Sequence, residues 1–129
     1  MYWSDYILET IEVSTLDGQH RTILFDHNVT NPRSISIDAT DSQRKIFWTD
    51  WGRYPRIETA GLDGSDRVVI VNEKLYWPNG LTLDLTTKRV YFMDARLDYI
   101  EFCNYDGSKR TQVLANDHVS KFIKEMIIF

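Results

Sequence analysis

The sequence predicts an all-β protein made of repeated four-stranded antiparallel units. Three observations indicate this. An aromatic-rich tetrapeptide that ends in Asp occurs at 2–5, 47–50 and 91–94, and its copies start 45 and 44 residues apart. An Asp-Gly pair follows each copy, and short runs between these markers alternate polar and apolar residues. A unit of this length with four short strands is typical of a β-propeller blade.

The middle unit shows the four expected strands most clearly. Residues 34–37 alternate polar and apolar side chains, and similar runs follow at 45–49, 56–60 and 67–71. Period two over four to eight residues predicts a strand with one buried face. Asp63-Gly64 supplies a turn between the third and fourth runs, because Gly adopts positive φ without a steric cost.

The other units are read by the same markers. The first unit starts directly at its tetrapeptide and therefore lacks the innermost strand, whereas the second and third have all four. We expect residues 1–115 to form three repeats. After Ala115 the pattern fails, since Phe122 stands where the spacing calls for Pro. Residues 116–129 are a divergent tail or the start of a fourth blade.

Bulk properties limit the function classes. The chain has 129 residues, of which 43% are apolar, and a net charge of −4. This length suits one domain, and the charge argues against a nucleic-acid surface. No apolar run approaches the roughly 20 residues of a membrane helix, and no leader precedes Tyr2, so a signal peptide and membrane anchor are expected outside this chain. Cys103 is the single cysteine, which excludes an intrachain disulfide.

Several motifs carry a resemblance to a known family. Phe47-Trp48-Thr49-Asp50-Trp51-Gly52, Leu62-Asp63-Gly64 and Trp77-Pro78-Asn79-Gly80 occur in order. In these stretches the chain resembles the YWTD (class B) repeats of the low-density lipoprotein receptor family. The resemblance covers about residues 1–115 and implies a six-bladed propeller, of which about three blades are present. It also implies a place on the extracellular side of endocytic or signalling receptors.

The motif residues are interpreted as structural. Aromatic side chains on the second strand of each blade are expected to be buried between neighbouring blades. The Asp that ends this strand is expected to accept backbone N–H groups or to meet an Arg. One Asp per blade suits this role better than a shared calcium site, so no metal and no cofactor are expected. The structural set is Tyr2, Trp3, Asp5, Phe47, Trp48, Asp50, Tyr91, Phe92 and Asp94.

A ligand face is expected where two kinds of connection meet. In an up-and-down meander, second-to-third and fourth-to-first connections share one face, here residues 6–9, 51–56, 95–98, 26–32 and 72–79. The resemblance implies that this face receives protein ligands or other modules of the same receptor. The candidates on it are Arg53, Tyr54, Arg96, Asp98, Trp51 and Trp77, although packing beneath the loops is an alternative role for both Trp residues.

Asn28-Val29-Thr30 is a sequon for N-glycosylation in the loop that enters the second blade. With extracellular-type repeats, it indicates a glycoprotein that faces the extracellular side of the plasma membrane or is secreted.

The function that the sequence favours is non-catalytic protein binding, as a propeller segment of a receptor related to the low-density lipoprotein receptor. Such a segment would contribute to ligand binding or release in endocytosis or signalling. A nidogen-type matrix or adhesion propeller is the alternative. A calcium-dependent lactonase-like enzyme is disfavoured, since neither a Gly-x-Ser-x-Gly turn nor metal-type His spacing is present.

Three blades do not close a propeller, and unclosed blades expose apolar faces. We therefore expect either a piece of a larger receptor, because repeats are stabilised by their neighbours, or a homodimer in which two copies close one ring.

Overall fold

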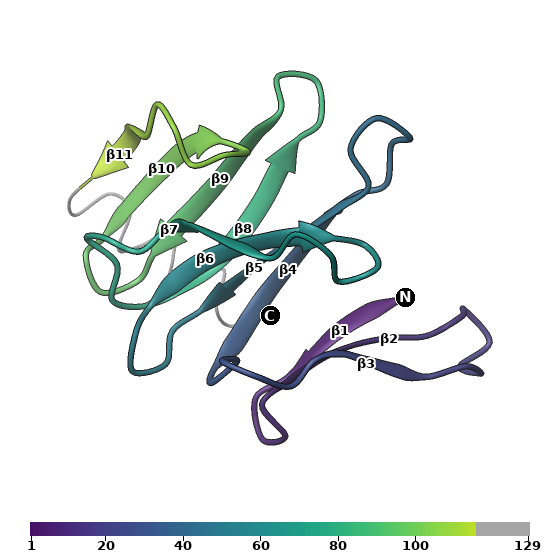
Figure 1. Cartoon of the computed structure of the whole chain (residues 1–129). Helices are drawn as coiled ribbons and strands as arrows, with labels where there is room; N and C mark the ends of the chain where they lie inside the picture. The colour runs from purple at the N-terminus through teal and green to yellow at the C-terminus, as the bar shows by residue number, and fades with distance from the viewer. Residues whose placement is uncertain (116–129) are drawn as a thin grey trace.

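The computed structural model describes residues 1–115, which form three antiparallel sheets (Figure 1). The first sheet contains β1 (Tyr2–Asp5), β2 (Thr10–Val13) and β3 (Thr22–Phe25). The second contains β4 (Pro32–Asp38), β5 (Lys45–Asp50), β6 (Arg56–Gly61) and β7 (Val68–Val71). The third contains β8 (Pro78–Asp84), β9 (Arg89–Asp94), β10 (Tyr99–Asn104) and β11 (Thr111–Ala115). The expectation for 116–129 lies outside the described residues.

Each sheet is a meander in which strands pair with their neighbours in the sequence. The predicted all-β fold with four-stranded antiparallel units is confirmed, and the four runs of the middle unit become β4 to β7. The Asp-Gly turns behave as expected, because Gly64 and Gly107 both have positive φ, at 87° and 84°. The first sheet has three strands.

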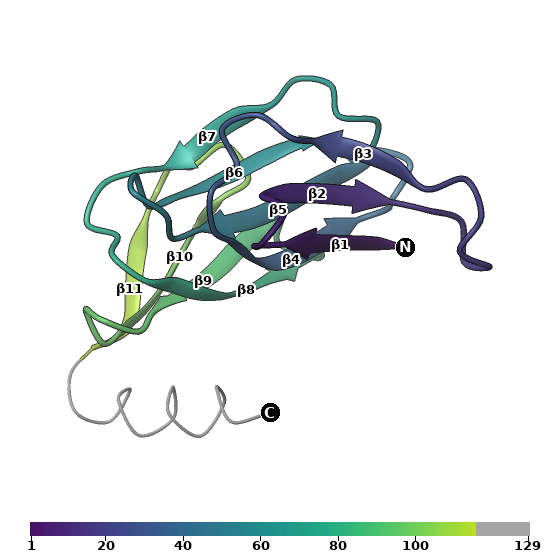
Figure 2. The ribbon, with the colours of Figure 1, turned by 90° about the horizontal axis from the view of Figure 1, so that it is seen from below.

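The sheets stand side by side, with their first strands nearest one another. β1 packs beside β4, and β4 packs beside β8. Figure 2 shows β1, β4 and β8 along one edge of the molecule, while β3 and β7 lie along the opposite edge. This is the radial order of propeller blades, in which each sheet presents one face to the blade before it and one to the blade after it.

The apolar core lies between the sheets, in two clusters. Adjacent residues of a strand point to opposite faces, so Trp48 faces the first sheet and Phe47 faces the third, and both are fully buried. Burying a side chain of this size contributes about 1.5–3 kcal/mol. The first cluster contains Ile11, Phe25, Val29, Ile46, Trp48 and Ala60. The second contains Phe47, Ile57, Val71, Leu75, Leu81, Val90, Phe92, Tyr99 and Cys103.

An ion pair recurs at each blade and reaches back to the preceding one. Arg67 pairs with Glu58 at 2.7 Å, and its guanidinium lies 5.2 Å from the centre of the Trp48 ring. It also donates to the carbonyl oxygens of His27 and Asn28, in the connection that leaves the first sheet. Its side chain is consequently 21% exposed.

The other two blades repeat this arrangement. Arg110 pairs with Glu101 and donates to the carbonyl of Glu73, in the connection that leaves the second sheet. Arg21 pairs with Glu12 and lies over Trp3, but its side chain is 59% exposed because no described blade precedes it. Motif residues are therefore buried where a neighbouring blade is present, as for Trp48, and half-buried where none is, as for Trp3.

Candidate functional site

One end of the three sheets carries the connections that the sequence analysis selected. We call it the loop face, and it comprises the turns 6–9, 51–55 and 95–98 with the connections 26–31 and 72–77. Backbone hydrogen bonds join turns to connections, since Trp51 N donates to Asn31 O at 3.1 Å and Ala95 N donates to Trp77 O at 2.9 Å. The loop face is thus a set of paired loops, one pair for each complete blade.

The carboxylate of Asp50 holds the loop pair of the second blade. It accepts hydrogen bonds from the backbone N–H groups of Thr30 at 2.8 Å, Asn31 at 3.1 Å and Gly52 at 2.9 Å. Thr30 Oγ1 also donates to it at 2.9 Å, and the Arg56 guanidinium lies 3.4 Å away. Burial by itself raises the pKa of Asp50, but these backbone bonds and the Arg56 charge outweigh it and hold the pKa below its usual value.

Asp94 does the same for the third blade. One of its oxygens accepts from the N–H groups of Tyr76 and Trp77, at 2.6 and 3.0 Å, and the other from those of Arg96 and Leu97, both at 2.9 Å. The carboxylate is fully buried. The Asp residues of the repeated tetrapeptide therefore fix the loops that carry the aromatic and Arg side chains of the loop face.

Aromatic and Arg side chains stack into a continuous cluster on the loop face. The rings of Trp51 and Trp77 meet edge to face, with their centres 6.2 Å apart. The Arg96 guanidinium lies 5.0 Å from the ring centre of Tyr76 and 5.5 Å from that of Trp77, and the Arg33 guanidinium lies 4.9 Å from that of Trp51. Trp77 remains 43% exposed, while Trp51 is half-buried.

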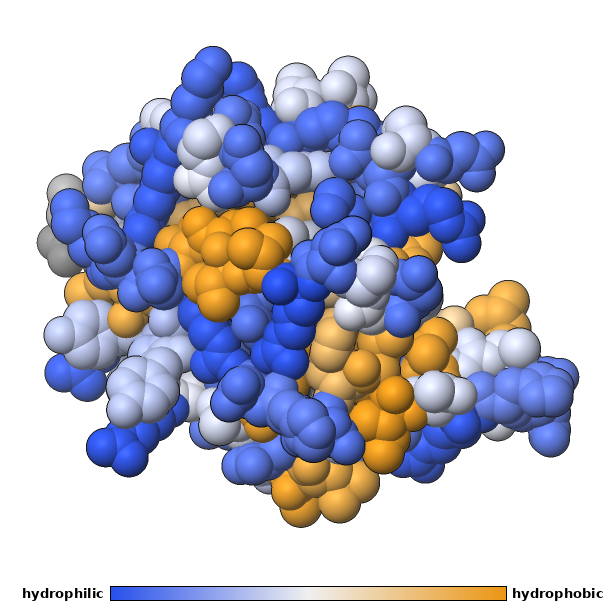
Figure 3. Space-filling model, viewed as in Figure 1, coloured by the Kyte–Doolittle hydropathy of each residue, from blue (hydrophilic) through white to orange (hydrophobic). Residues whose placement is uncertain are grey.

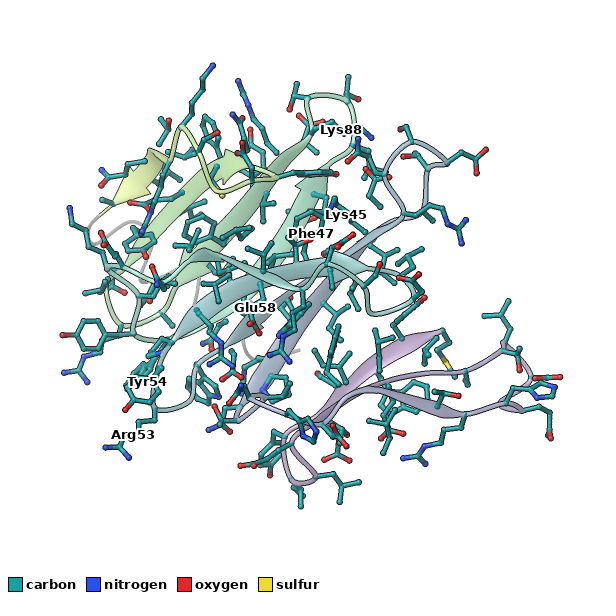
Figure 4. The ribbon with its side chains drawn as sticks, in the orientation of Figure 1. Lys45, Phe47, Arg53, Tyr54, Glu58 and Lys88 are labelled. Atoms are coloured by element: carbon teal, nitrogen blue, oxygen red, sulfur yellow. The ribbon has the colours of Figure 1, made fainter. Side chains whose placement is uncertain are left out.

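Arg53 and Tyr54 stand apart from this cluster. Both are exposed at the tip of the β5–β6 turn and project outward from it in Figure 4. The Arg53 guanidinium lies 5.5 Å from the Tyr54 ring centre. Asp98 is half-buried at the end of the β9–β10 turn, with φ at 52°. The structure thus brings Trp51, Trp77 and Arg96 together and leaves Arg53, Tyr54 and Asp98 at two separate turns.

The Arg residues of the loop face differ from those inside the blades. Arg56, Arg67 and Arg110 all make ion pairs with Asp or Glu. Within residues 1–115, by contrast, no carboxylate lies within ion-pair distance of three loop-face guanidinium groups, those of Arg33, Arg53 and Arg96. Each of these lies over an aromatic ring instead, which leaves its N–H donors for an external acceptor.

Arg33 is a residue that the sequence analysis missed. It lies where the register between β4 and β5 shifts, between the Pro32 and Ile35 pairings. A bulge of this kind changes the direction of a side chain, so the period-two pattern did not predict the face on which Arg33 lies. The signal in the sequence was the Arg that follows Pro32, because the equivalent position after Pro78 in the next unit is Asn79.

The β1–β2 turn also contributes exposed apolar side chains to the loop face. Tyr6, Ile7 and Leu8 are 65%, 74% and 60% exposed, and apolar side chains gather over this turn at the lower edge of Figure 3. The turn is fixed, because Asp5 Oδ1 accepts from Ile7 N at 2.8 Å and Leu8 N at 2.9 Å.

Asn28, the sequon residue, is exposed in the connection from β3 to β4, with φ at 52°. Its backbone carbonyl accepts from Arg56 and Arg67. Asn tolerates this left-handed conformation better than most residues. Its side chain has no hydrogen bond among the described contacts, whereas Thr30 is held by Asp50.

Across residues 1–115, no three His, Cys, Asp or Glu side chains come together in a way that could hold a metal ion. The same part of the chain contains no helix with the length and apolar character to cross a membrane.

Comparisons with known proteins agree with this architecture. The profile of the family described as "Low-density lipoprotein receptor repeat class B" matches residues 1–39 and 44–85. The human "Low-density lipoprotein receptor-related protein 5-like protein" is 36% identical over 95% of this chain and 48% of its own length. The "Vitellogenin receptor" of Solenopsis invicta is 37% identical over 88% of this chain and 6% of its own length.

Among solved structures, a chain of the "Crystal structure of Nidogen/Laminin Complex" matches with a TM-score of 0.81 and 36% identity. The match covers 86% of this chain and 42% of that chain. The chain therefore spans about half the length, or far less, of the relatives it matches.

Proposed function

The chain belongs to the low-density lipoprotein receptor class B (YWTD) repeat family, and from that premise we propose that it is a non-catalytic, protein-binding propeller segment of an extracellular receptor. In this proposal, its loop face contributes to ligand binding or ligand release in endocytosis or signalling. The partners are secreted proteins or other modules of the same receptor.

One observation carries the proposal. Buried Asp50 and Asp94 hold the loops of two blades by backbone hydrogen bonds, so the Arg and aromatic side chains above them are presented in fixed positions. Trp, Tyr and Arg are the residues that most often dominate binding energy at protein interfaces. Fixed loops also lose less conformational entropy on binding than mobile ones.

The test is binding of secreted proteins to the full chain and to a variant with Arg53, Tyr54 and Arg96 all changed to Ala. We expect the variant to lose at least about tenfold in affinity, since hot-spot residues cost 2 kcal/mol or more on truncation, at roughly 1.4 kcal/mol per tenfold. Arg89→Ala is the control, because Arg89 stacks on Phe102 at the opposite end of the sheet. Unchanged affinity in the triple variant would place the ligand face elsewhere.

A matrix or adhesion role is the second candidate, and the likeness to a chain from the nidogen–laminin structure favours it. The loop face would then bind a matrix protein. Binding of purified laminin, measured beside a panel of soluble secreted proteins, separates the two roles. Strong laminin binding with no binding to the panel would favour the matrix role.

We also propose that the ring is completed outside the described residues. Further repeats of the same polypeptide complete it in one version, and a second copy of this chain in the other. Light scattering of the purified chain distinguishes them. A single dimer with one cooperative thermal transition indicates two half-rings, whereas a broad mass distribution indicates dependence on further repeats.

Finally, we propose that Asn28 carries an N-linked glycan. Its exposed side chain next to a Thr two residues later supports the proposal. Because the site lies on a connection of the loop face, a glycan there would restrict how closely a partner approaches the first two blades.

A further inference from the structure

A hollow lies beside the β5–β6 turn, on the side of the second blade that carries its outer strand. It has a volume of about 290 Å³. Its walls are residues 53–56 of the turn, Val69 of β7, and Asn72 and Leu75 of the connection to β8. All of these residues belong to the second blade, which has its four strands and a neighbouring sheet on each side. The hollow is therefore a property of that blade itself.

The β5–β6 turn is one residue longer than the equivalent turns. It spans residues 51–55, whereas the turns of the first and third blades span 6–9 and 95–98. Tyr54 is 69% exposed in this turn and projects outward from it beside Arg53 (Figure 4). The longer turn thus carries an aromatic ring to the rim of the hollow.

The chemistry of the hollow suits a sugar ring. Tyr54 and Val69 offer apolar surface to the C–H groups of a pyranose. The Arg53 guanidinium lies over the Tyr54 ring, with no carboxylate in ion-pair distance among residues 1–115, and Asn72 adds a side-chain amide. Both can donate hydrogen bonds to hydroxyl or acetamide oxygens. The volume is close to the roughly 300 Å³ at which small-molecule pockets begin.

The sequon residue Asn28 lies next to this hollow. Its backbone carbonyl accepts hydrogen bonds from Arg56, which lines the hollow, and from Arg67. Arg56 Nη1 in turn donates to the carbonyl oxygen of Tyr54 at 3.0 Å. One Arg side chain therefore joins the backbone of the exposed Asn28 to that of the exposed Tyr54, so a glycan on Asn28 begins within reach of the hollow.

We propose that the core of an N-glycan on Asn28 packs into this hollow. The first N-acetylglucosamine ring lies against Tyr54, and its acetamide oxygen accepts a hydrogen bond from Arg53. A glycan attached next to the hollow has a far higher effective concentration there than a free sugar. The inference rests on the N-glycan proposed above and gives that glycan a fixed position.

The proposal has a consequence for ligand binding. A docked glycan covers part of Arg53 and Tyr54. In the glycosylated protein, the affinity lost in the variant with Arg53, Tyr54 and Arg96 changed to Ala would then come mainly from Arg96, which lies outside the hollow.

Nuclear magnetic resonance of the full chain, expressed in a secretory cell line, tests the position of the glycan. The intact mass first measures how much of the protein carries a glycan on Asn28. We expect the acetamide methyl of the first N-acetylglucosamine to shift upfield and to show nuclear Overhauser effects to the Tyr54 ring protons. Tyr54→Leu should keep the mass of the glycan and lose the upfield shift.

Thermal melts give an independent readout. Enzymatic removal of the glycan should lower the melting temperature of the wild type by about 3 °C, the scale of one stacking contact in a domain of this size. It should have little effect in Tyr54→Leu. Tyr76→Leu is the matched control and should keep the full difference, because Tyr76 is 52% exposed on the loop face and also lies under an Arg, but outside the hollow. The conversion of Asn28 to Asp on removal is common to all three proteins.

The outcomes separate this inference from the glycosylation on which it rests. If the mass shows the glycan but the methyl shift is the same in the wild type and in Tyr54→Leu, the docking is wrong and the glycosylation stands. An equal melting difference in the wild type, Tyr54→Leu and Tyr76→Leu would also overturn the docking. A mass without a glycan would refute both.

Discussion

The backbone N–H of Trp77 donates a 3.0 Å hydrogen bond to the carboxylate of Asp94, 17 residues later in the chain. The other oxygen of the same carboxylate accepts from Arg96 N and Leu97 N. A single buried group therefore fixes both loops that carry the Trp77 and Arg96 side chains. Stability of the fold and shape of the loop face depend on the same atoms.

Asp94→Asn is the first prediction that follows from this arrangement. Both carboxylate oxygens each accept two N–H groups, so an amide would place its own NH2 against two donors in a fully buried site. We expect a loss of about 3 kcal/mol in the free energy of unfolding, measured by urea denaturation.

Asp5→Asn is the matched control. Asp5 accepts both of its turn hydrogen bonds on one oxygen, Oδ1, at a more exposed position. An Asn side chain keeps that acceptor, so the expected loss is under about 1 kcal/mol. Equal losses at the two positions would contradict the role assigned to the second oxygen of Asp94.

The Asp-Gly turns give a second prediction, about the contact between blades. A Cβ on Gly107 would lie 2.1 Å from the carbonyl oxygen of Ile70, in the outer strand of the second sheet. A Cβ on Gly18 would meet nothing within 4 Å, although φ is similar at the two positions, at 84° and 78°. We expect Gly18→Ala to cost about 1 kcal/mol, for the left-handed backbone alone, and Gly107→Ala to cost several times more.

Thermal unfolding of the two Gly variants measures this difference. Since both substitutions carry the same backbone cost, the excess at Gly107 reports the steric fit of the third blade on the second. Similar melting temperatures for the two variants would mean that these blades do not pack as described.

Much of this fold follows from the sequence, because a repeat multiplies every signal. The alternation at 34–37 and 45–49 predicts β4 and β5 within a few residues, since period two reports the faces of a strand. The paired loops follow from the meander order. The turn chemistry of Asp63-Gly64 is local, so the sequence alone contains it.

The rest depends on contacts that no local pattern reports. Asp38 accepts hydrogen bonds from Lys88 Nζ at 2.8 Å and Tyr105 Oη at 2.9 Å, which are 50 and 67 residues away in the sequence. Arg33 lies at a bulge, which breaks the period from which its face would be read. The loop-face cluster of Trp51, Trp77 and Arg96 likewise joins two blades.

Asp38 gives a third prediction, on pH dependence. Burial alone would raise the pKa of Asp38, but hydrogen bonds from Lys88, Thr40 and Tyr105 outweigh it and hold the pKa well below its usual range. A depressed pKa in the folded state means that the stabilisation is present above the unfolded pKa of about 4 and is lost as the pH falls below it.

Urea denaturation between pH 2 and pH 7 tests this dependence. The free energy of unfolding should fall steadily below about pH 4, and Asp38→Asn should lower it at neutral pH while flattening its decline in acid. An undiminished acid slope in Asp38→Asn would show that other carboxylates carry the effect.

The repeated Arg–Glu pair gives a fourth prediction. Arg67→Ala removes the nearer of the two Arg partners of Glu58, which is 4% exposed, together with the bonds to His27 O and Asn28 O, and leaves Arg56 3.5 Å from the Glu58 carboxylate. We expect a loss of about 3 kcal/mol in the free energy of unfolding. Arg21→Ala removes the equivalent Arg, whose side chain is 59% exposed and makes no bond to a preceding blade among the described residues, so water can reach the buried Glu12 carboxylate and the cost should be clearly smaller. A ranking in the opposite order would contradict the inter-blade role of this Arg.

The last prediction concerns the sequon, and it separates the effect of a glycan on Asn28 from the effect of Thr30 on the stability of the fold. Asn28→Asp removes the glycosylation site but keeps a residue that tolerates positive φ and a backbone carbonyl for Arg67. Expressed in a secretory cell line, this variant should lack the mass of one N-glycan. Its melting temperature should equal that of the wild type after enzymatic deglycosylation. Thr30→Ala should lose the glycan as well, but it also removes the 2.9 Å bond to Asp50 and should unfold at lower temperature.

Because Thr30 Oγ1 is held by Asp50 in the folded chain, glycosylation is expected before the second blade folds. Refolded unglycosylated protein should therefore be a poor substrate for the transferase. If it were modified as efficiently as the unfolded chain, the loop that enters the second blade would have to open far more readily than its hydrogen bonds indicate.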